Sequence, residues 1–361
     1  MAADPVILEL EGMYSEQLLE DTLFGPTGYI YHTPRLGLDL PTTDVPADIR
    51  HRTEGLFMFR RFLPAEEIAL FPNLKVVVRM GVGYDRLDRI TLAQRGVKVC
   101  NIPDYGTTEV ADHALALALA LRRGVLLHHE LQRASPPAPW VAVDSPLIQR
   151  PSGPTAPLTN RYAPPRPRTF GVLGLGRIGT AAALRAKAFG WRVVFFDPYL
   201  PNGVDRSFGF VRCLTIEELF RQSDTLSLHT PLTNKTRGLV DERLLRLMPA
   251  GAVLINTSRG PVVDLDGLHA VLRDSHLAGA GLDVVPQEEG NYINQPDAVV
   301  HPLIDAYRKK EDWLVGRLVI SPHSAFHSAD AWEDIRSLSA ETMKDVLIDG
   351  KNTNVIPPDA E

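Results

Sequence analysis

Three residues that could bind an acid group and exchange a proton each follow a stretch rich in aliphatic residues. They are Arg259, Glu288 and His323. A guanidinium presents a planar, permanently charged fork to a carboxylate, and an imidazole titrates nearest to neutral pH. A glutamate close to that imidazole would fix its tautomer and favour its protonated form. Together the three residue types suit hydride transfer at a carbon that bears oxygen beside a carboxylate, with Arg259 binding the acid and His323 exchanging the proton.

A glycine-rich turn has the G-x-G-x-x-G spacing that accompanies dinucleotide binding. Its residues are Gly174, Leu175, Gly176, Arg177, Ile178 and Gly179. The first glycine permits a tight turn, the second lets backbone approach a pyrophosphate, and the third lets the following helix pack closely on the strand. Free N–H groups at the start of that helix attract phosphates. Such a turn alone is a weak signal, but an apolar strand precedes it and an alanine-rich helix follows it.

Asp197 ends the next predicted strand, at about the 20-residue spacing expected for an acidic residue that binds the ribose of NAD. Its carboxylate could accept hydrogen bonds from both ribose hydroxyls and would repel the 2′-phosphate of NADP. We therefore expect NAD(H) as the cofactor. The alternative is that Asp197 only starts the turn that continues with Pro198.

The elements that must position these residues are predicted from residue 169 onward, where strand-length apolar stretches alternate with helical ones. Predicted strands cover 169–173, 192–196, 225–229, 252–256, 279–283 and 318–321, and predicted helices include 178–189 and 264–273. This alternation is typical of a doubly wound α/β sheet, which binds ligands at the carboxyl ends of its strands. Taken singly, the three candidate residues have ordinary alternatives: a surface arginine, a solvated glutamate and a structural histidine. Their joint position after successive strands favours the chemistry.

The chain before residue 169 has a weaker α/β pattern and one segment of different character. Predicted strands cover 6–10, 55–59, 75–79 and 97–100, a short helix covers 64–70, and 25–48 is predicted to be a loop. Residues 108–123 are apolar nearly all round, which predicts a buried helix. Residues 134–168 are rich in proline, which indicates a surface segment outside the core.

Composition excludes several classes of protein. A chain of 361 residues suggests about two domains, and a net charge of −6 gives no support for binding to nucleic acid or an anionic membrane. The cysteines, Cys100 and Cys213, are expected to be reduced core thiols of an intracellular protein.

No signal peptide or membrane-spanning run is predicted, so we expect a cytoplasmic protein. We also expect no bound metal.

The sequence resembles the D-isomer-specific 2-hydroxyacid dehydrogenase family over residues 55–133 and 169–350. The motifs that carry the resemblance occur in the expected order at 79–85, 174–179, 229–233, 256–260, 282–284 and 321–323. Residues 183–190, 196–200 and 203–204 are similar to one branch, the C-terminal binding proteins. These are NAD(H)-binding transcriptional corepressors that kept the dehydrogenase fold, and they also have a long segment before the strand at 169.

The resemblance implies an architecture of two Rossmann-like, doubly wound domains. A flavodoxin-like substrate domain would combine residues 1–109 with 326–361, and an NAD-binding domain, 110–325, would be inserted between these parts. It also implies a homodimer formed through the NAD-binding domain. The predicted helix at 108–123 and the segment 134–168 would supply the contact.

The resemblance also implies roles for individual residues. Arg259 would bind the substrate carboxylate and carbonyl, His323 would be the general acid and base, and Glu288 would be the partner of His323. The substrate would further meet Met80, Gly81, Val82, Gly83 and Phe326, with backbone N–H groups of 81–83 donating to its carboxylate. The cofactor would be lined by the glycine turn and Asp197, and by Thr230, Pro231, Thr236, Thr257, Ser258, Asp283 (near the nicotinamide amide) and His323.

Departures from the family pattern keep two functions open. Glu289 replaces the usual proline after Glu288, Phe326 stands where the corepressors have tryptophan, and 289–317 is longer and more charged than usual. The first hypothesis is an enzyme that interconverts a small D-2-hydroxy acid and its 2-keto acid. The alternative is an NAD(H)-sensing scaffold of the corepressor type, which would bind partner peptides and would be nuclear.

A module that binds another nucleotide would leave Arg259, Glu288 and His323 without a role. Arg60 and Arg61 follow a predicted strand, and they would either bind a second acidic group of the substrate or be ordinary surface charges.

Overall fold

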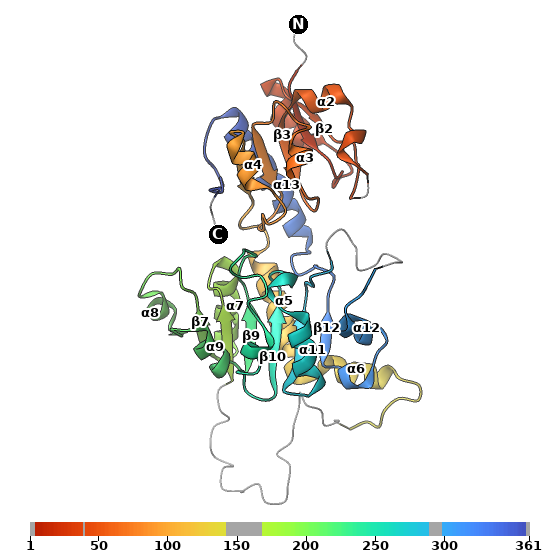
Figure 1. Ribbon diagram of the computed structural model, residues 1–361, viewed down its shortest axis with the longest axis vertical. Helices are drawn as coiled ribbons and strands as arrows, with labels where there is room; N and C mark the ends of the chain where they lie inside the picture. Colours follow the sequence, from red (N-terminus) through yellow and green to blue (C-terminus); the bar gives the residue numbers. More distant parts are fainter. Residues whose placement is uncertain (1–3, 39, 142–167, 289–297, 359–361) are drawn as a thin grey trace, which may run out of the picture. The chain divides into compact units, whose positions relative to one another are not determined.

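The computed structural model describes residues 4–38, 40–141, 168–288 and 298–358. The chain forms two compact units (Figure 1). Unit 1 combines Met1–Gly106 with His327–Glu361, and unit 2 is Thr107–Phe326. Unit 2 is therefore inserted into unit 1, and each unit contains one parallel sheet.

Unit 1 is built on a five-stranded parallel sheet in the order β2-β1-β3-β4-β5. The strands are β1 (Val6–Glu9), β2 (Ile30–His32), β3 (Thr53–Met58), β4 (Val76–Arg79) and β5 (Lys98–Asn101). This order is the flavodoxin-like one, in which the sheet reverses direction beside β1. The helices are α1 (Leu18–Phe24), α2 (Ala47–Arg52), α3 (Ala65–Ile68), α4 (Arg89–Gln94) and α13 (Ala329–Met343).

The predicted loop over 25–48 is wrong in part, because it contains β2, two short 3₁₀ turns and the start of α2. Strand β2 has three residues and pairs in parallel with β1, with Ile30 opposite Val6. A strand this short shows no usable two-residue periodicity in the sequence. Its structure comes from pairing with a buried neighbour, which local residue types do not report.

Unit 2 is built on a seven-stranded parallel sheet in the order β12-β11-β10-β9-β6-β7-β8. The strands are β6 (Thr169–Leu173), β7 (Arg192–Phe196), β8 (Val211–Arg212), β9 (Thr225–Leu228), β10 (Ala252–Asn256), β11 (Leu277–Leu282) and β12 (Leu318–Ile320). The chain builds one half outward from β6 and the other outward from β9, so the topological switch lies between these two strands. The predicted doubly wound α/β fold is confirmed; only the two-residue edge strand β8 was missed.

Helices cover both faces of this sheet (Figure 1). They are α5 (Thr107–Arg123), α6 (Val125–Arg133), α7 (Arg177–Ala188), α8 (Val204–Phe208), α9 (Ile216–Gln222), α10 (Glu242–Leu245), α11 (Leu265–Arg273) and α12 (Pro302–Arg308). Alternate residues of β10 belong to two apolar clusters. Val253 and Ile255 pack with α5 and α7, whereas Leu254 packs with α9, α11 and α12.

The buried helix predicted at 108–123 is α5. Ala111, Ala114, Ala118 and Leu121 are at most 1% exposed, and the helix packs against α7 and β10 of its own unit. Much of its apolar surface is therefore used inside unit 2. The predicted dimer contact also involves 142–167, which lie outside the described residues, so the dimer stays a prediction.

Two other expectations can be compared with the structure. Cys100 and Cys213 are buried and unpaired, as predicted, and burial raises the pKa of the Cys100 thiol to about 12. Within the described ranges, no helix is both long and apolar enough to cross a membrane.

Candidate active site

The glycine-rich turn follows β6 and leads directly into α7. Gly174 has a φ of 88°, which a residue with a side chain rarely adopts. A Cβ atom on Gly179 would lie 2.1 Å from the Gly174 carbonyl oxygen, so the helix can approach the turn only with glycine there. A Cβ atom on Gly176 would meet nothing within 4 Å. No side chain caps α7, and the start of such a helix favours an anion.

Asp197 lies at the carboxyl end of β7 and accepts two backbone hydrogen bonds. Its Oδ2 accepts from Leu175 N at 2.9 Å, and its Oδ1 accepts from Tyr199 N at 3.0 Å. The carboxylate starts the Asp-Pro turn and also bonds to the glycine turn, so the ribose contact stays a prediction. Each oxygen can accept a further hydrogen bond, and the side chain is half-buried.

Replacing Asp197 by asparagine is expected to weaken the discrimination against NADPH. The substitution keeps the shape and an acceptor oxygen but removes the charge that opposes a 2′-phosphate. The ratio of the NADPH to the NADH dissociation constant should fall about 10-fold or more. Fluorescence titration with both cofactors measures it, and an unchanged ratio would show that Asp197 does not face the ribose.

Two predicted cofactor residues have buried hydroxyl groups without a partner. In the described part of the chain, neither Thr230 Oγ1 nor Thr257 Oγ1 makes a hydrogen bond. Thr230 follows β9 and Thr257 follows β10, and these strands are neighbours in the sheet. Unsatisfied buried hydroxyls are uncommon. Together with the open space at Gly176, they make this sheet edge fit a dinucleotide.

Other predicted cofactor residues use their polar groups inside unit 2. Thr236 Oγ1 donates to the Pro231 carbonyl at 2.6 Å, and Ser258 donates from N and Oγ to Asn256 Oδ1 at 3.0 and 2.8 Å. Asp283 is 1% exposed. These residues shape the loops, and their contact with the cofactor stays a prediction.

The structure brings Glu288 and His323 together. Glu288 Oε1 lies 2.7 Å from His323 Nδ1, and Glu288 Oε2 accepts from Val285 N at 3.2 Å. An ionised carboxylate only accepts hydrogen bonds, so the proton of a neutral imidazole lies on Nδ1. Nε2 of His323 is then the ring nitrogen that does not face Glu288. Both side chains are partly exposed, His323 by 30% and Glu288 by 18%.

Arg259 lies on the loop after β10, and backbone packing brings that loop against the one that carries Glu288. A Cβ atom on Gly260 would lie 2.1 Å from the Val285 carbonyl carbon. Fully buried Asn256 donates from Nδ2 to the Arg259 carbonyl at 2.9 Å. The spacing of the motif at 256–260 was the only sequence signal for these structural roles of Asn256 and Gly260.

Asp283 has a structural role that the sequence did not predict. It accepts hydrogen bonds from Ser321 Oγ at 2.6 Å, Ser324 N at 2.9 Å and Ala325 N at 2.9 Å. It thereby holds the segment that carries His323. Phe326, the predicted substrate contact, is buried, and its ring meets the His323 ring edge-on at 6.4 Å.

Fewer backbone amides of the predicted substrate loop, residues 80–83, are available to a ligand than expected. Met80 N donates to the Met58 carbonyl and Gly81 N donates to the Arg79 carbonyl, both at 2.8 Å. Both residues are buried, so their amides serve the fold. In the described part of the chain, the amides of Val82 and Gly83 make no such bond, and these two remain for a ligand.

The two interpretations of Arg60 and Arg61 need a correction. Arg61 is neither a surface charge nor free for a substrate, because it is buried and donates to the carbonyls of Gly37 and Leu40 at 2.9 Å. A buried guanidinium needs such hydrogen-bond partners, since an unpaired buried charge is unfavourable. Arg60 is exposed, with its guanidinium 5.5 Å from the centre of the Phe59 ring.

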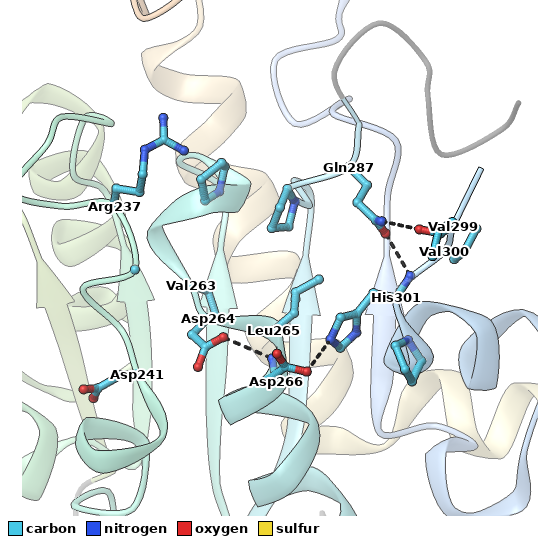
Figure 2. Close-up of a pocket in the computed structure, with 14 residues that line it drawn as sticks. Arg237, Asp241, Val263, Asp264, Leu265, Asp266, Gln287, Val299, Val300 and His301 are labelled. Atoms are coloured by element: carbon cyan, nitrogen blue, oxygen red, sulfur yellow. Dashed lines mark hydrogen bonds and ion pairs between the residues drawn. The ribbon is translucent and has the colours of Figure 1, made fainter. Parts of the chain in front are cut away.

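A pocket of about 640 Å³ in unit 2 is separate from these residues (Figure 2). Gln287 bridges one wall by donating to the Val299 carbonyl at 2.6 Å and accepting from His301 N at 2.9 Å. None of the predicted catalytic or cofactor residues lines it. Nowhere in the described ranges do three His, Cys, Asp or Glu side chains gather to hold a metal ion.

Comparison with known proteins agrees with this geometry. Residues 115–325 match the model of the D-isomer specific 2-hydroxyacid dehydrogenase, NAD binding domain. The chain is 35% identical over 295 residues to a glyoxylate reductase of Korarchaeum cryptofilum, covering 82% of this chain and 78% of that protein. It is 30% identical over 287 residues to C-terminal-binding protein 1 of Caenorhabditis elegans, covering 79% of this chain but only 36% of that protein.

A solved structure shares the whole fold. It is the D-lactate dehydrogenase of Aquifex aeolicus in complex with NAD and lactic acid, with a TM-score of 0.77 and 26% identity, covering 97% of this chain and 98% of that one. The residues that match the family model include the glycine turn, Asp197 and the segments of Arg259, Glu288 and His323. The chain therefore belongs to the D-isomer-specific 2-hydroxyacid dehydrogenase family, and the matched residues are the family's NAD-binding domain.

Proposed function

We propose that this protein interconverts a small D-2-hydroxy acid and its 2-keto acid with NAD(H). The observation that carries the proposal is the contact of 2.7 Å between Glu288 Oε1 and His323 Nδ1, beside the loop of Arg259, on a dinucleotide-binding sheet. A carboxylate paired with an imidazole is a general acid and base with a fixed tautomer. Arg259 adds the permanent positive charge that an acid substrate requires.

Each residue has a separate task in reduction. The Arg259 guanidinium binds the substrate carboxylate and polarises the adjacent carbonyl, which orients the acid. Protonated His323 gives a proton from Nε2 to the carbonyl oxygen, and Glu288 stabilises the imidazolium before that transfer. NADH, when bound along the glycine turn, supplies the hydride to the carbonyl carbon. In oxidation, His323 takes the proton of the hydroxyl group instead.

Relatives suggest the first substrates to test. One relative is a glyoxylate reductase, and one similar structure is a D-lactate dehydrogenase. Glyoxylate and pyruvate are therefore the starting members of a panel of 2-keto acids that increase in side-chain size. Oxidation of NADH is followed by absorbance, with NADPH as the comparison cofactor.

The panel separates the enzyme from the alternative. Turnover of at least one acid, with preference for NADH, is expected. NADH binding without turnover of any acid would instead support an NAD(H)-sensing scaffold with peptide partners, which similarity to C-terminal-binding protein 1 favours as the second candidate.

Replacing Glu288 by glutamine is expected to reduce kcat about 10- to 100-fold. The amide oxygen can still accept from Nδ1 of His323, but its missing charge no longer stabilises the imidazolium. Stopped-flow and steady-state assays across pH measure the loss, and NADH affinity should stay constant. If this variant kept the wild-type kcat, the Glu288 carboxylate would have no part in proton transfer by His323.

We also propose the assignment of the two units and their assembly. Unit 2 binds the cofactor, and unit 1 is the substrate domain, in which Val82 and Gly83 have free amides. The protein forms a homodimer through unit 2, which sedimentation velocity would test.

A further inference from the structure

Helix α5 carries a histidine for which the proposed reaction has no role. His113 lies on this helix among buried alanine and leucine residues. Its Nε2 atom is 2.9 Å from the hydroxyl oxygen of Ser321, two positions before His323. The His113 side chain is 26% exposed. A specific polar contact therefore holds the ring.

The donor and the acceptor can be assigned in both hydrogen bonds that link His113 through Ser321 to Asp283. Ser321 Oγ lies 2.6 Å from Asp283 Oδ1, and an ionised carboxylate can only accept, so Ser321 donates to Asp283. The same hydroxyl then accepts from Nε2–H of His113. His113 Nε2 also lies 3.6 Å from Asp283 Oδ1. Within the described ranges it is the only basic side chain that close to this carboxylate, which is 1% exposed.

Asp283 in turn holds the backbone around His323. Its carboxylate accepts from Ser324 N and Ala325 N, each at 2.9 Å, and its carbonyl accepts from His323 N at 2.8 Å. His323 has a φ of 51°, in the left-handed region that few residues with side chains adopt. Such a conformation persists only where surrounding contacts hold it.

We propose that His113 is a positioning residue for the catalytic histidine. Through Ser321 it orients the buried Asp283 carboxylate, and that carboxylate keeps residues 321–325 in the conformation that directs His323 to Glu288. The catalytic consequence rests on the proposed function. The consequence for the backbone does not, which allows the two to be tested separately.

Two matched pairs of variants test the proposal. His113→Gln places an amide N–H near the position of Nε2, whereas His113→Asn is too short to reach Ser321. Ser321→Thr keeps the hydroxyl group, whereas Ser321→Ala removes it. If either pair contains a variant that does not fold, the other pair decides.

Hydrogen–deuterium exchange of a peptide spanning 321–326 and steady-state kinetics are the two measurements. In His113→Asn and Ser321→Ala, exchange should be about 10-fold faster, as expected for a lost hydrogen bond. Their kcat should fall about 10- to 100-fold through misplacement of His323, with NADH affinity unchanged. His113→Gln and Ser321→Thr should remain close to wild type in both measurements.

Equal exchange within each pair would overturn the proposal. If the wild-type protein turns over no keto acid, the proposed function fails, while the exchange comparison still decides whether His113 positions this segment. Faster exchange with unchanged kcat in an active enzyme would show a purely structural contact and would also overturn the positioning role.

Discussion

Replacing His323 by alanine is expected to lower kcat/KM for the keto acid by about 10²- to 10⁴-fold, the usual contribution of general acid–base catalysis. Nε2 of His323 is the only nitrogen of the Glu288–His323 pair left to exchange a proton with the substrate. NADH affinity should be unchanged, because the glycine turn and Asp197 are untouched. Steady-state kinetics and fluorescence titration measure the two effects.

A matched control for this variant is His129→Ala. His129 is exposed on α6, away from the carboxyl ends of the strands, and its loss should leave kcat/KM at the wild-type value. Added imidazole should restore part of the activity of His323→Ala by supplying the missing acid. Retention of more than about a tenth of wild-type kcat/KM by His323→Ala would assign the proton transfer to another group.

Replacing Arg259 by glutamine is expected to lower kcat/KM by about 10²- to 10³-fold, because a charge that stabilises the developing oxyanion and binds the carboxylate is lost. Both a higher KM and a lower kcat should contribute. Arg259→Lys should recover only part of the loss, since an ammonium group keeps the charge but not the two-pronged geometry. Initial rates over a range of keto acid concentrations separate the two parameters.

Arg237→Gln is the matched control for Arg259. Arg237 is an exposed arginine that lines the pocket in Figure 2, so the variant removes the same charge outside the proposed site. It should retain wild-type kcat/KM. If Arg259→Gln and Arg237→Gln behave alike, general electrostatic attraction rather than a specific contact explains the effect.

Local patterns were sufficient for most of unit 2. The strands that follow one another from residue 169 have continuous apolar runs, which parallel strands buried on both faces require. The glycine turn was recognised from its spacing between a strand and a helix, and Gly174 and Gly179 each meet a steric or backbone demand there. Unit 1 was less predictable. Its edge strand β2 depends on pairing with β1, and a three-residue segment contains no periodicity.

Local sequence patterns could not predict the hydrogen bonds between the loops of the site. The carboxylate of Asp283, a predicted cofactor residue, also holds residues 321–325. The amide of Met80, a predicted substrate residue, is bonded to the Met58 carbonyl. In both cases the hydrogen-bond partner is distant in sequence, and no spacing rule identifies such a partner.

By itself, the sequence of this protein determined the α/β class, the dinucleotide site and the identity of Arg259, Glu288 and His323 as candidates, because these depend on residue types and short spacings. Only the tertiary structure decided that Glu288 Oε1 lies within 2.7 Å of His323 Nδ1, and that His113, Ser321 and Asp283 are linked behind them. The physical reason is that parallel strands bring their carboxyl ends to one edge of a sheet, while the course of each following loop sets which side chains meet there.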